Sequence, residues 1–209
     1  LEEKKAIELF DGHVASCSFQ KNIKIWDKNN GQLIQRINEN HLLCNIFQLK
    51  NGALVTGSFE GKVISFYKKV NENFIFDQEI QGVNGSNQYS MAYDGNETII
   101  CGSFREMVFI NTTLKNITSR INFREDEIEL YVTSIFCQNN FIIAGCSNGE
   151  LIIMESKKEG DEIMNNYSIK KNYYTKSEYS IKFIVYDKNK KNVFLTSIDG
   201  SITIANLSI

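Results

Sequence analysis

Residues 15–27 read ASCSFQKNIKIWD, and residues 55–67 read VTGSFEGKVISFY. Both stretches begin with small residues, reach Ser-Phe, pass through a polar turn and end in an alternating apolar run. Alternation of apolar and polar residues predicts a half-buried β-strand, and the polar step between the two runs predicts a turn. Two related strand–turn–strand units in one chain indicate that the chain is built from a repeat.

The pattern returns three more times, as ICGSFREMVFIN, IAGCSNGELIIM and FLTSIDGSITIA. We align the five copies on the small residue before the Ser or Cys and call these positions the anchors. The anchors are Cys17, Gly57, Gly102, Gly145 and Thr196, spaced 40, 45, 43 and 51 residues apart. Another apolar run precedes each copy and a fourth follows some of them. The sequence therefore predicts units of about four short antiparallel strands.

The rest of the chain favours an all-β fold. No convincing amphipathic helix is found, and only Thr118–Leu130 is expected to allow a helical turn. Four strands in roughly 45 residues match the period of a propeller blade.

The repeat resembles the WD-repeat β-propeller family, most clearly in ASCSFQKNIKIWD with its closing Trp26-Asp27. The resemblance covers nearly the whole chain and implies a single all-β propeller region with about five four-stranded antiparallel blades. The expected blades span residues 1–40, 41–86, 87–127, 128–172 and 173–209. Because the family usually closes with seven blades, and because the chain begins without Met and ends in a third strand, we expect an incomplete portion of a seven-bladed ring. A closed five-bladed ring is the alternative.

The resemblance also implies a structural hydrogen-bond set in each blade, formed by a His, a Ser or Thr, an Asp and a Trp. This chain carries the set only in part. The residues that match it are His41, Ser58, Trp26, Asp27 and Asp199. In the second repeat Glu60 and Phe66 replace the Asp and the Trp. We expect these residues to stabilise blades and not to form a binding site.

In the first three repeats a phenylalanine follows the Ser that comes directly after the anchor: these residues are Phe19, Phe59 and Phe104. In the family this position lies at the mouth of the central channel, and matching residues contact bound peptides, in some cases by sandwiching an Arg side chain. The resemblance thus implies a partner-binding surface made of these three rings. The alternative interpretation is that they pack against the adjacent blade, as buried aromatic residues commonly do.

Composition and charge restrict the function. The net charge of the 209 residues is −2, with acids and bases interspersed, so direct nucleic-acid binding is not expected. No apolar run approaches the ~20 residues that span a bilayer, so membrane insertion is not expected. Five cysteines without a CxxC pattern favour free thiols in a reducing compartment. We therefore expect an intracellular protein, in the cytoplasm or alternatively in the nucleus.

Catalytic patterns are weak. The two histidines lack further ligands at metal-binding spacing, and no nucleophile–base pattern or phosphate-binding loop is found. Glu8 is the only acid in the middle of an expected inner strand, whereas a glycosidase needs a pair. We therefore expect no enzyme activity, no metal and no cofactor.

The sequence favours a non-catalytic scaffold that binds other proteins or peptides, within a multi-protein complex. The first alternative is a structural subunit of a large coat, cytoskeletal, ciliary or ribonucleoprotein assembly. The second is a five-bladed carbohydrate-active enzyme.

Overall fold

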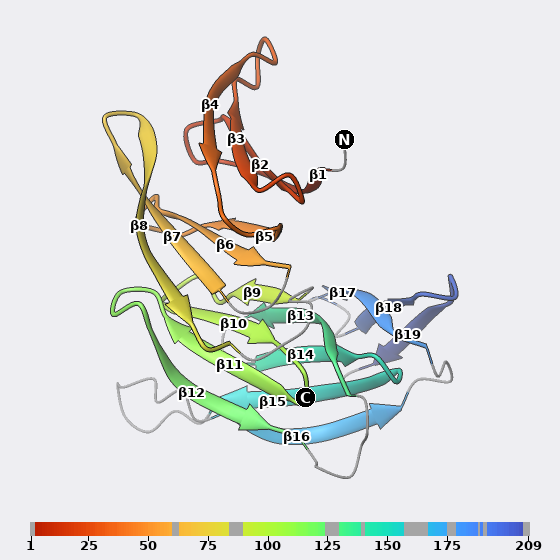
Figure 1. Cartoon of the computed structure of the whole chain (residues 1–209). Helices are drawn as coiled ribbons and strands as arrows, with labels where there is room; N and C mark the ends of the chain where they lie inside the picture. Colours follow the sequence, from red (N-terminus) through yellow and green to blue (C-terminus); the bar gives the residue numbers. More distant parts are fainter. Residues whose placement is uncertain are drawn as a thin grey trace. The chain divides into compact units, whose positions relative to one another are not determined.

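The computed structural model describes residues 3–59, 63–83, 90–123, 130–138, 141–156, 167–174, 179–187, 189 and 192–206. All regular structure in these ranges is β, and it forms five antiparallel sheets in which each strand pairs with its neighbour along the chain (Figure 1). Four sheets have four strands and the fifth has three. The prediction of an all-β chain of about five blade-type sheets is confirmed.

The chain divides into two compact units. The first contains residues 1–89 and 114–116, and its strands form two sheets. The first sheet consists of β1 (Glu3–Glu8), β2 (Val14–Ser18), β3 (Asn22–Trp26) and β4 (Leu33–Asn38). The second consists of β5 (Leu43–Gln48), β6 (Leu54–Ser58), β7 (Val63–Val70) and β8 (Asn73–Gln81).

The second unit contains residues 90–113 and 117–209, and its strands form three sheets. The third sheet consists of β9 (Met91–Tyr93), β10 (Thr98–Gly102), β11 (Glu106–Asn111) and β12 (Asn116–Asn122). The fourth consists of β13 (Val132–Gln138), β14 (Phe141–Cys146), β15 (Glu150–Ser156) and β16 (Tyr167–Tyr174). The fifth consists of β17 (Ile181–Asp187), β18 (Asn192–Ser197) and β19 (Ile202–Asn206).

The five anchors occupy one structural position. Each lies at the end, or one residue before the end, of the second strand of its sheet. In the second unit a glycine is needed there because the next sheet packs directly on the backbone. A Cβ on Gly102 would collide with Val132 in β13, and one on Gly145 would collide with Ile181 in β17. At these two anchors the missing side chain therefore makes room for the neighbouring sheet.

The first strand of four sheets is interrupted opposite the anchor. The pairing register shifts at Glu3/Lys5, Leu43/Asn45, Val132/Ser134 and Ile181/Phe183. Such a bulge redirects one side chain. Thr133, at one bulge, lies within hydrogen-bonding distance of the Gly145 carbonyl in its own sheet and of the Ile181 carbonyl in the next, at 3.1 and 2.6 Å. The bulge thus helps to join neighbouring sheets.

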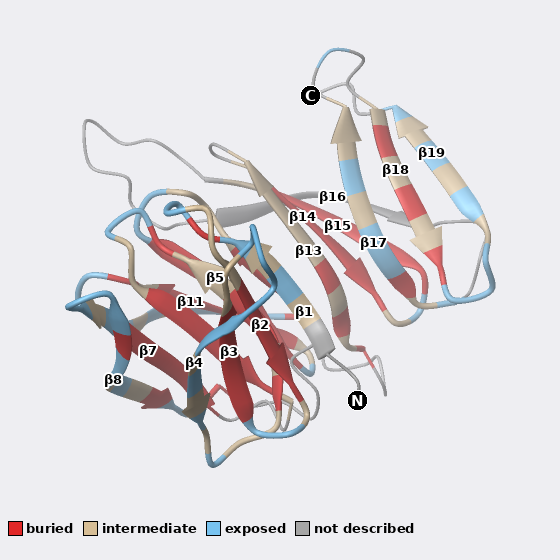
Figure 2. Cartoon of the chain, turned by 90° about the horizontal axis from the view of Figure 1, so that it is seen from above, coloured by how far each residue is buried: buried red, intermediate tan, exposed pale blue. Residues whose placement is uncertain are grey.

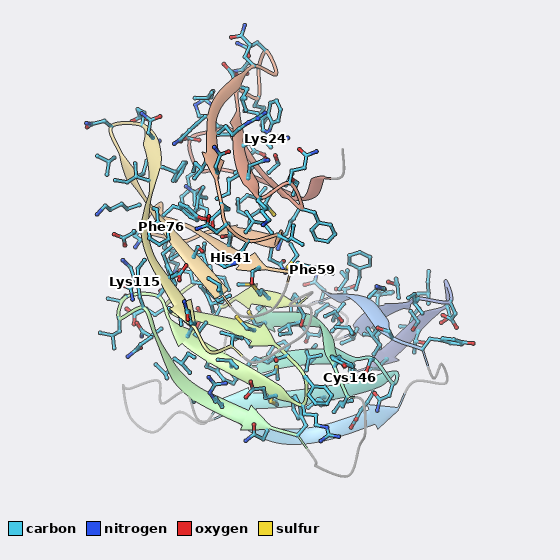
Figure 3. The ribbon with its side chains drawn as sticks, viewed as in Figure 1. Lys24, His41, Phe59, Phe76, Lys115 and Cys146 are labelled. Atoms are coloured by element: carbon cyan, nitrogen blue, oxygen red, sulfur yellow. The ribbon has the colours of Figure 1, made fainter. Side chains whose placement is uncertain are left out.

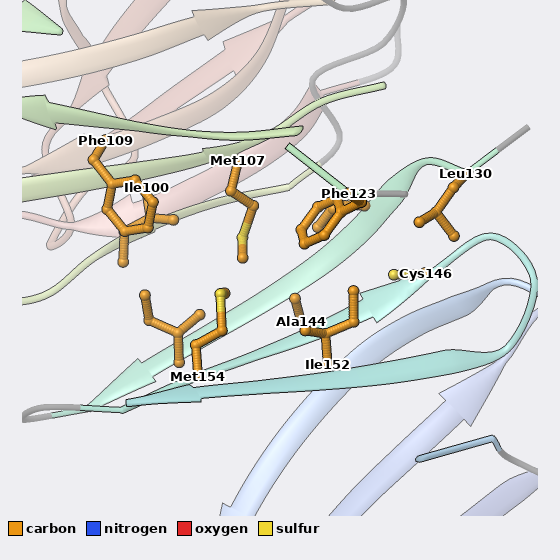
Figure 4. Packing of buried hydrophobic residues seen from close by; sticks show 11 residues of the cluster. Ile100, Met107, Phe109, Phe123, Leu130, Ala144, Cys146, Ile152 and Met154 are labelled. Carbon is orange, nitrogen blue, oxygen red and sulfur yellow. The ribbon is translucent and has the colours of Figure 1, made fainter. Parts of the chain in front are cut away.

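Three buried clusters hold sheets together within the units. In the first unit, Ala15, Ile23 and Ile25 pack against Ile46 and Tyr67 of the second sheet. In the second unit, Ile100, Met107 and Phe109 face Ala144, Ile152 and Met154 of the fourth sheet (Figure 4). A third cluster joins the fourth and fifth sheets. Burial is greatest on the second and third strands, as β2 and β3 show in Figure 2.

Two details differ from expectation. The helical turn allowed in Thr118–Leu130 is wrong for its first part, because β12 runs from Asn116 to Asn122 with its side chains alternating in exposure. Residues 124–129, with their four acids, lie outside the described residues. β16 extends to Tyr174, past the expected blade boundary at residue 172, whereas the other described strands lie within the expected spans. The division into one propeller region with these boundaries stays a prediction.

Candidate functional site

Two of the three predicted phenylalanines lie together in the first unit. Phe19 follows β2 and Phe59 follows β6, and their ring centroids are 4.6 Å apart at an interplanar angle of 63°. This edge-to-face geometry contributes about 0.5–1.5 kcal/mol beyond burial. Both residues keep part of their surface exposed, so the pair is accessible from solvent.

The segment between β4 and β5 lies beside both aromatic turns. The Glu39 amide donates to the Lys21 carbonyl at 2.7 Å, and the Phe59 amide donates to the Leu42 carbonyl at 2.6 Å. This short connection is therefore tied to the turn that follows Phe19 and to Phe59 itself. It brings the side chains of residues 39–42 to the same edge of the two sheets.

Charged groups accompany this connection. His41 Nε2 lies 3.9 Å from Glu79 Oε2 in β8 (His41 and Phe59 are labelled in Figure 3). Burial raises the pKa of Glu39 above that of an ordinary glutamate, and the nearby Glu79 charge acts in the same direction. We call Phe19, Phe59, Glu39, His41 and Glu79 the aromatic–acidic cluster. The face of an aromatic ring and a carboxylate both attract a cationic side chain.

Phe104 belongs to the second unit and has partners of its own. Its ring centroid lies 5.0 Å from that of Tyr131, and the Arg105 guanidinium carbon lies 4.9 Å from it. The two aromatic residues also form a β-bridge. With 37% of its surface exposed, Phe104 remains open on one side. Its ring therefore shows that a guanidinium can stack at this repeat position.

The predicted structural residues do not form one repeated network. The Trp26 indole N–H donates to Ser16 Oγ at 2.9 Å, but Ser16 was not singled out from the sequence. Ser16 could have been found from its position: it precedes the anchor Cys17 on β2, the strand that pairs with the β3 strand of Trp26. Ser58 Oγ accepts from the Val63 amide at 3.2 Å and His41 faces Glu79 instead. Asp27 and Asp199 accept backbone amides from Asn29 and Ser201 in tight turns.

The second sheet has no tryptophan at the equivalent position. Alignment of the strand registers places Tyr67 at the position of Trp26, one residue after the Phe66 that the sequence spacing predicted, and Thr56 at the position of Ser16. The hydroxyls of Tyr67 and Thr56 are both buried, and neither has a hydrogen-bond partner in the structure. The hydrogen bond between Trp26 and Ser16 therefore has no counterpart in the second sheet.

The described part of the chain offers few side chains that could bind a metal ion or act as a nucleophile. No group of three or more His, Cys, Asp or Glu side chains there could hold a metal ion. Burial raises the pKa of Cys44 to about 12, and that of Cys137 likewise to about 12, so both are thiols at neutral pH.

No helix in the described part of the chain is long and apolar enough to cross a membrane.

Comparison with solved structures finds this fold in the crystal structure of Raptor from Chaetomium thermophilum. The TM-score is 0.81 and the sequence identity 16%, over the whole of this chain and 20% of the Raptor chain. This likeness supports a WD40-like repeat fold for the chain. No protein-family model matches the chain, and no curated protein sequence matches it significantly.

Proposed function

We propose that the protein is a non-catalytic interaction scaffold of the WD-repeat type, which binds a partner protein or peptide through the edge of its sheets that carries the aromatic–acidic cluster. The supporting observation is the half-buried Phe19–Phe59 pair, which backbone hydrogen bonds join to the connection that contains Glu39. Rigid aromatic side chains provide contact area at low entropic cost and commonly anchor interfaces.

The chemistry of the cluster favours a basic side chain in the partner. A guanidinium or ammonium group over an aromatic face gains about 0.5–2 kcal/mol, and a carboxylate beside it adds charge complementarity. The Arg105–Phe104 stack, with its 4.9 Å separation, provides an internal precedent in the other unit. Phe104 stays in the proposal as a second contact point.

The direct test uses the purified chain and two pools of fluorescent peptides, one with a central Arg and one with citrulline in its place. We expect polarisation to detect binding of the Arg pool and at least tenfold weaker binding to an F19A/F59A variant. Phe10→Ala is the matched control, because Phe10 is 71% exposed and lies in the β1–β2 turn at the other end of the strands. Equal binding of the two pools, or unchanged binding by F19A/F59A, contradicts the proposal.

A second experiment separates the scaffold from a structural subunit. The chain and the F19A/F59A/F104A variant are purified from the producing cells, and the bound proteins are identified by mass spectrometry. Loss of a defined partner from the variant supports recognition through the phenylalanines. Recovery of the same large assembly with both forms favours a structural subunit held through other surfaces.

A further inference from the structure

One lysine of the first unit is held by uncharged partners. Lys5, at the bulge in β1, reaches β5 of the second sheet, where its Nζ donates to Asn45 Oδ1 at 3.1 Å. The same Nζ lies 3.9 Å from the ring centroid of Phe47. Asn45 is 5% exposed, whereas Lys5 and Phe47 are half-buried, so the group is partly accessible to solvent. We call Lys5, Asn45 and Phe47 the ammonium site.

Other lysines of this unit pair with carboxylates. Lys28 Nζ lies 2.6 Å from Glu8 Oε1, and Lys69 Nζ lies 2.9 Å from Asp11 Oδ2. Among the described residues, no carboxylate acts on Lys5 in this way. The ammonium of Lys5 is therefore set apart from these lysines by its lack of an acidic partner.

The charge of Lys5 is only partly stabilised by its surroundings. Burial lowers the pKa of Lys5 below that of an ordinary lysine, and the ionisable groups that act on it are the thiols of Cys17 and Cys44. Burial raises the pKa of Cys44 to about 12, so this thiol is neutral at pH 7 and supplies no opposite charge. An amide oxygen and a ring face stabilise an ammonium less than a carboxylate does. The ammonium site therefore suits an anion.

The ammonium site lies close to the aromatic–acidic cluster. Lys5 pairs with the anchor of the first sheet, and Asn45 pairs with the anchor of the second. In both sheets the anchor lies two residues before the phenylalanine of the cluster. At about 3.3 Å per strand residue, this spacing corresponds to roughly 7 Å along the strands. One extended peptide is long enough to reach both groups.

We propose that the ammonium site binds a carboxylate of the same partner peptide whose basic side chain the aromatic–acidic cluster holds. This inference rests on the proposed function and specifies the peptide: an Arg with an Asp or Glu about two residues away. The ammonium site offers one positive charge, and the acids Glu39 and Glu79 lie in the neighbouring cluster. A singly charged carboxylate therefore fits better than a phosphate group, whose second charge the acids repel.

The test uses four fluorescent peptides, which carry Arg or citrulline at one position and Glu or Gln two residues away. Polarisation with the purified chain is expected to show at least tenfold tighter binding of the Glu peptide than of the Gln peptide, in both the Arg and the citrulline pair. Lys5→Met is expected to abolish this difference and to leave the preference for Arg over citrulline unchanged, which also shows that the variant is folded. Lys5→Arg keeps the charge and should retain part of the Glu preference.

Lys28→Met is the matched control, because it removes the same charge from an exposed pair with Glu8 at the other end of the strands. Equal binding of the Glu and Gln peptides, or a Glu preference that survives Lys5→Met, overturns this inference, while a preference for Arg still supports the proposed function. A Glu preference that requires Lys5, without any preference for Arg, supports the ammonium site and contradicts the proposed function. Tighter binding of phosphoserine in place of Glu overturns the assignment of a carboxylate.

Discussion

Ile181 of β17 lies so close to Gly145 of β14 that a Cβ on the glycine would be 2.6 Å from Ile181 Cγ2 and 2.8 Å from its Cβ. Ser134 Oγ would be 2.6 Å away on another side. A backbone position enclosed in this way cannot accept even a methyl group without displacing the next sheet.

Gly145→Ala is therefore expected to destabilise the second unit by about 2–3 kcal/mol, through overpacking between the fourth and fifth sheets. Denaturant unfolding of both forms measures the loss. Gly200→Ala is the control: its φ of +82° strains an alanine, but nothing lies within 4 Å of the added Cβ. About 1 kcal/mol is expected there. A loss at Gly145 no larger than that at Gly200 would show that the sheets are not so closely packed.

The two equivalent hydroxyls next to the anchors should respond oppositely to removal. Ser16→Ala deprives the Trp26 indole of its acceptor and is expected to cost about 1 kcal/mol. Thr56→Val removes a buried hydroxyl that has no partner and is expected to leave stability unchanged or raise it by up to about 1 kcal/mol. Thermal unfolding of the two variants decides this, and a destabilised Thr56→Val would mean that the hydroxyl is bonded in solution.

Binding of the Arg peptide pool should depend on pH through Glu39. Burial raises the pKa of this carboxyl, so Glu39 takes up its proton at a higher pH than an ordinary glutamate as the solution is acidified. Affinity for a cationic probe is expected to fall through this range. Polarisation titrations from pH 7 downward measure the effect, and Glu39→Gln should bind weakly with a flatter profile. An identical profile for Glu39→Gln would remove this residue from the site.

Alkylation of the two half-buried cysteines, Cys44 and Cys137, should need strongly alkaline solution. Because burial raises their pKa from 9.0 to about 12, the thiolate fraction of Cys44 or Cys137 at pH 9 falls from half to about a thousandth. The folded chain then binds more protons than the unfolded chain between pH 9 and 12, so stability is lost as the pH rises through that range. Iodoacetamide labelling with peptide mapping tests this, and rapid labelling of folded chain at pH 8 would contradict it.

The fold could be predicted from the sequence because its signal is repeated. One small residue before Ser or Cys, a turn and an alternating run recur at Gly57, Gly102 and Gly145, and period-2 alternation distinguishes strand from helix. The helical turn predicted after Asn116 was wrong because polar residues with isolated isoleucines occur both in exposed outer strands and in helical turns. Its strand state depends on pairing within the sheet, which local sequence does not encode.

The site could be predicted only in part. The Phe19–Phe59 contact follows from the repeat, because equivalent positions in neighbouring sheets lie side by side. The contribution of Glu39 depends on a connection outside the repeat pattern, and its burial becomes visible only in three dimensions. The Ser16–Trp26 bond could have been found by comparing strand registers across the β2–β3 turn.

The lack of space beside Gly145 also bears on how far a sequence with this fold can vary. The neighbouring sheet restricts this position to glycine in the third and fourth sheets, whereas the same position is Cys17 in the first sheet and Thr196 in the fifth. Few positions then have to be fixed for the sheets to stack. Two chains can therefore share the fold with a TM-score of 0.81 when only 16% of their residues are identical, as this chain and part of Raptor do.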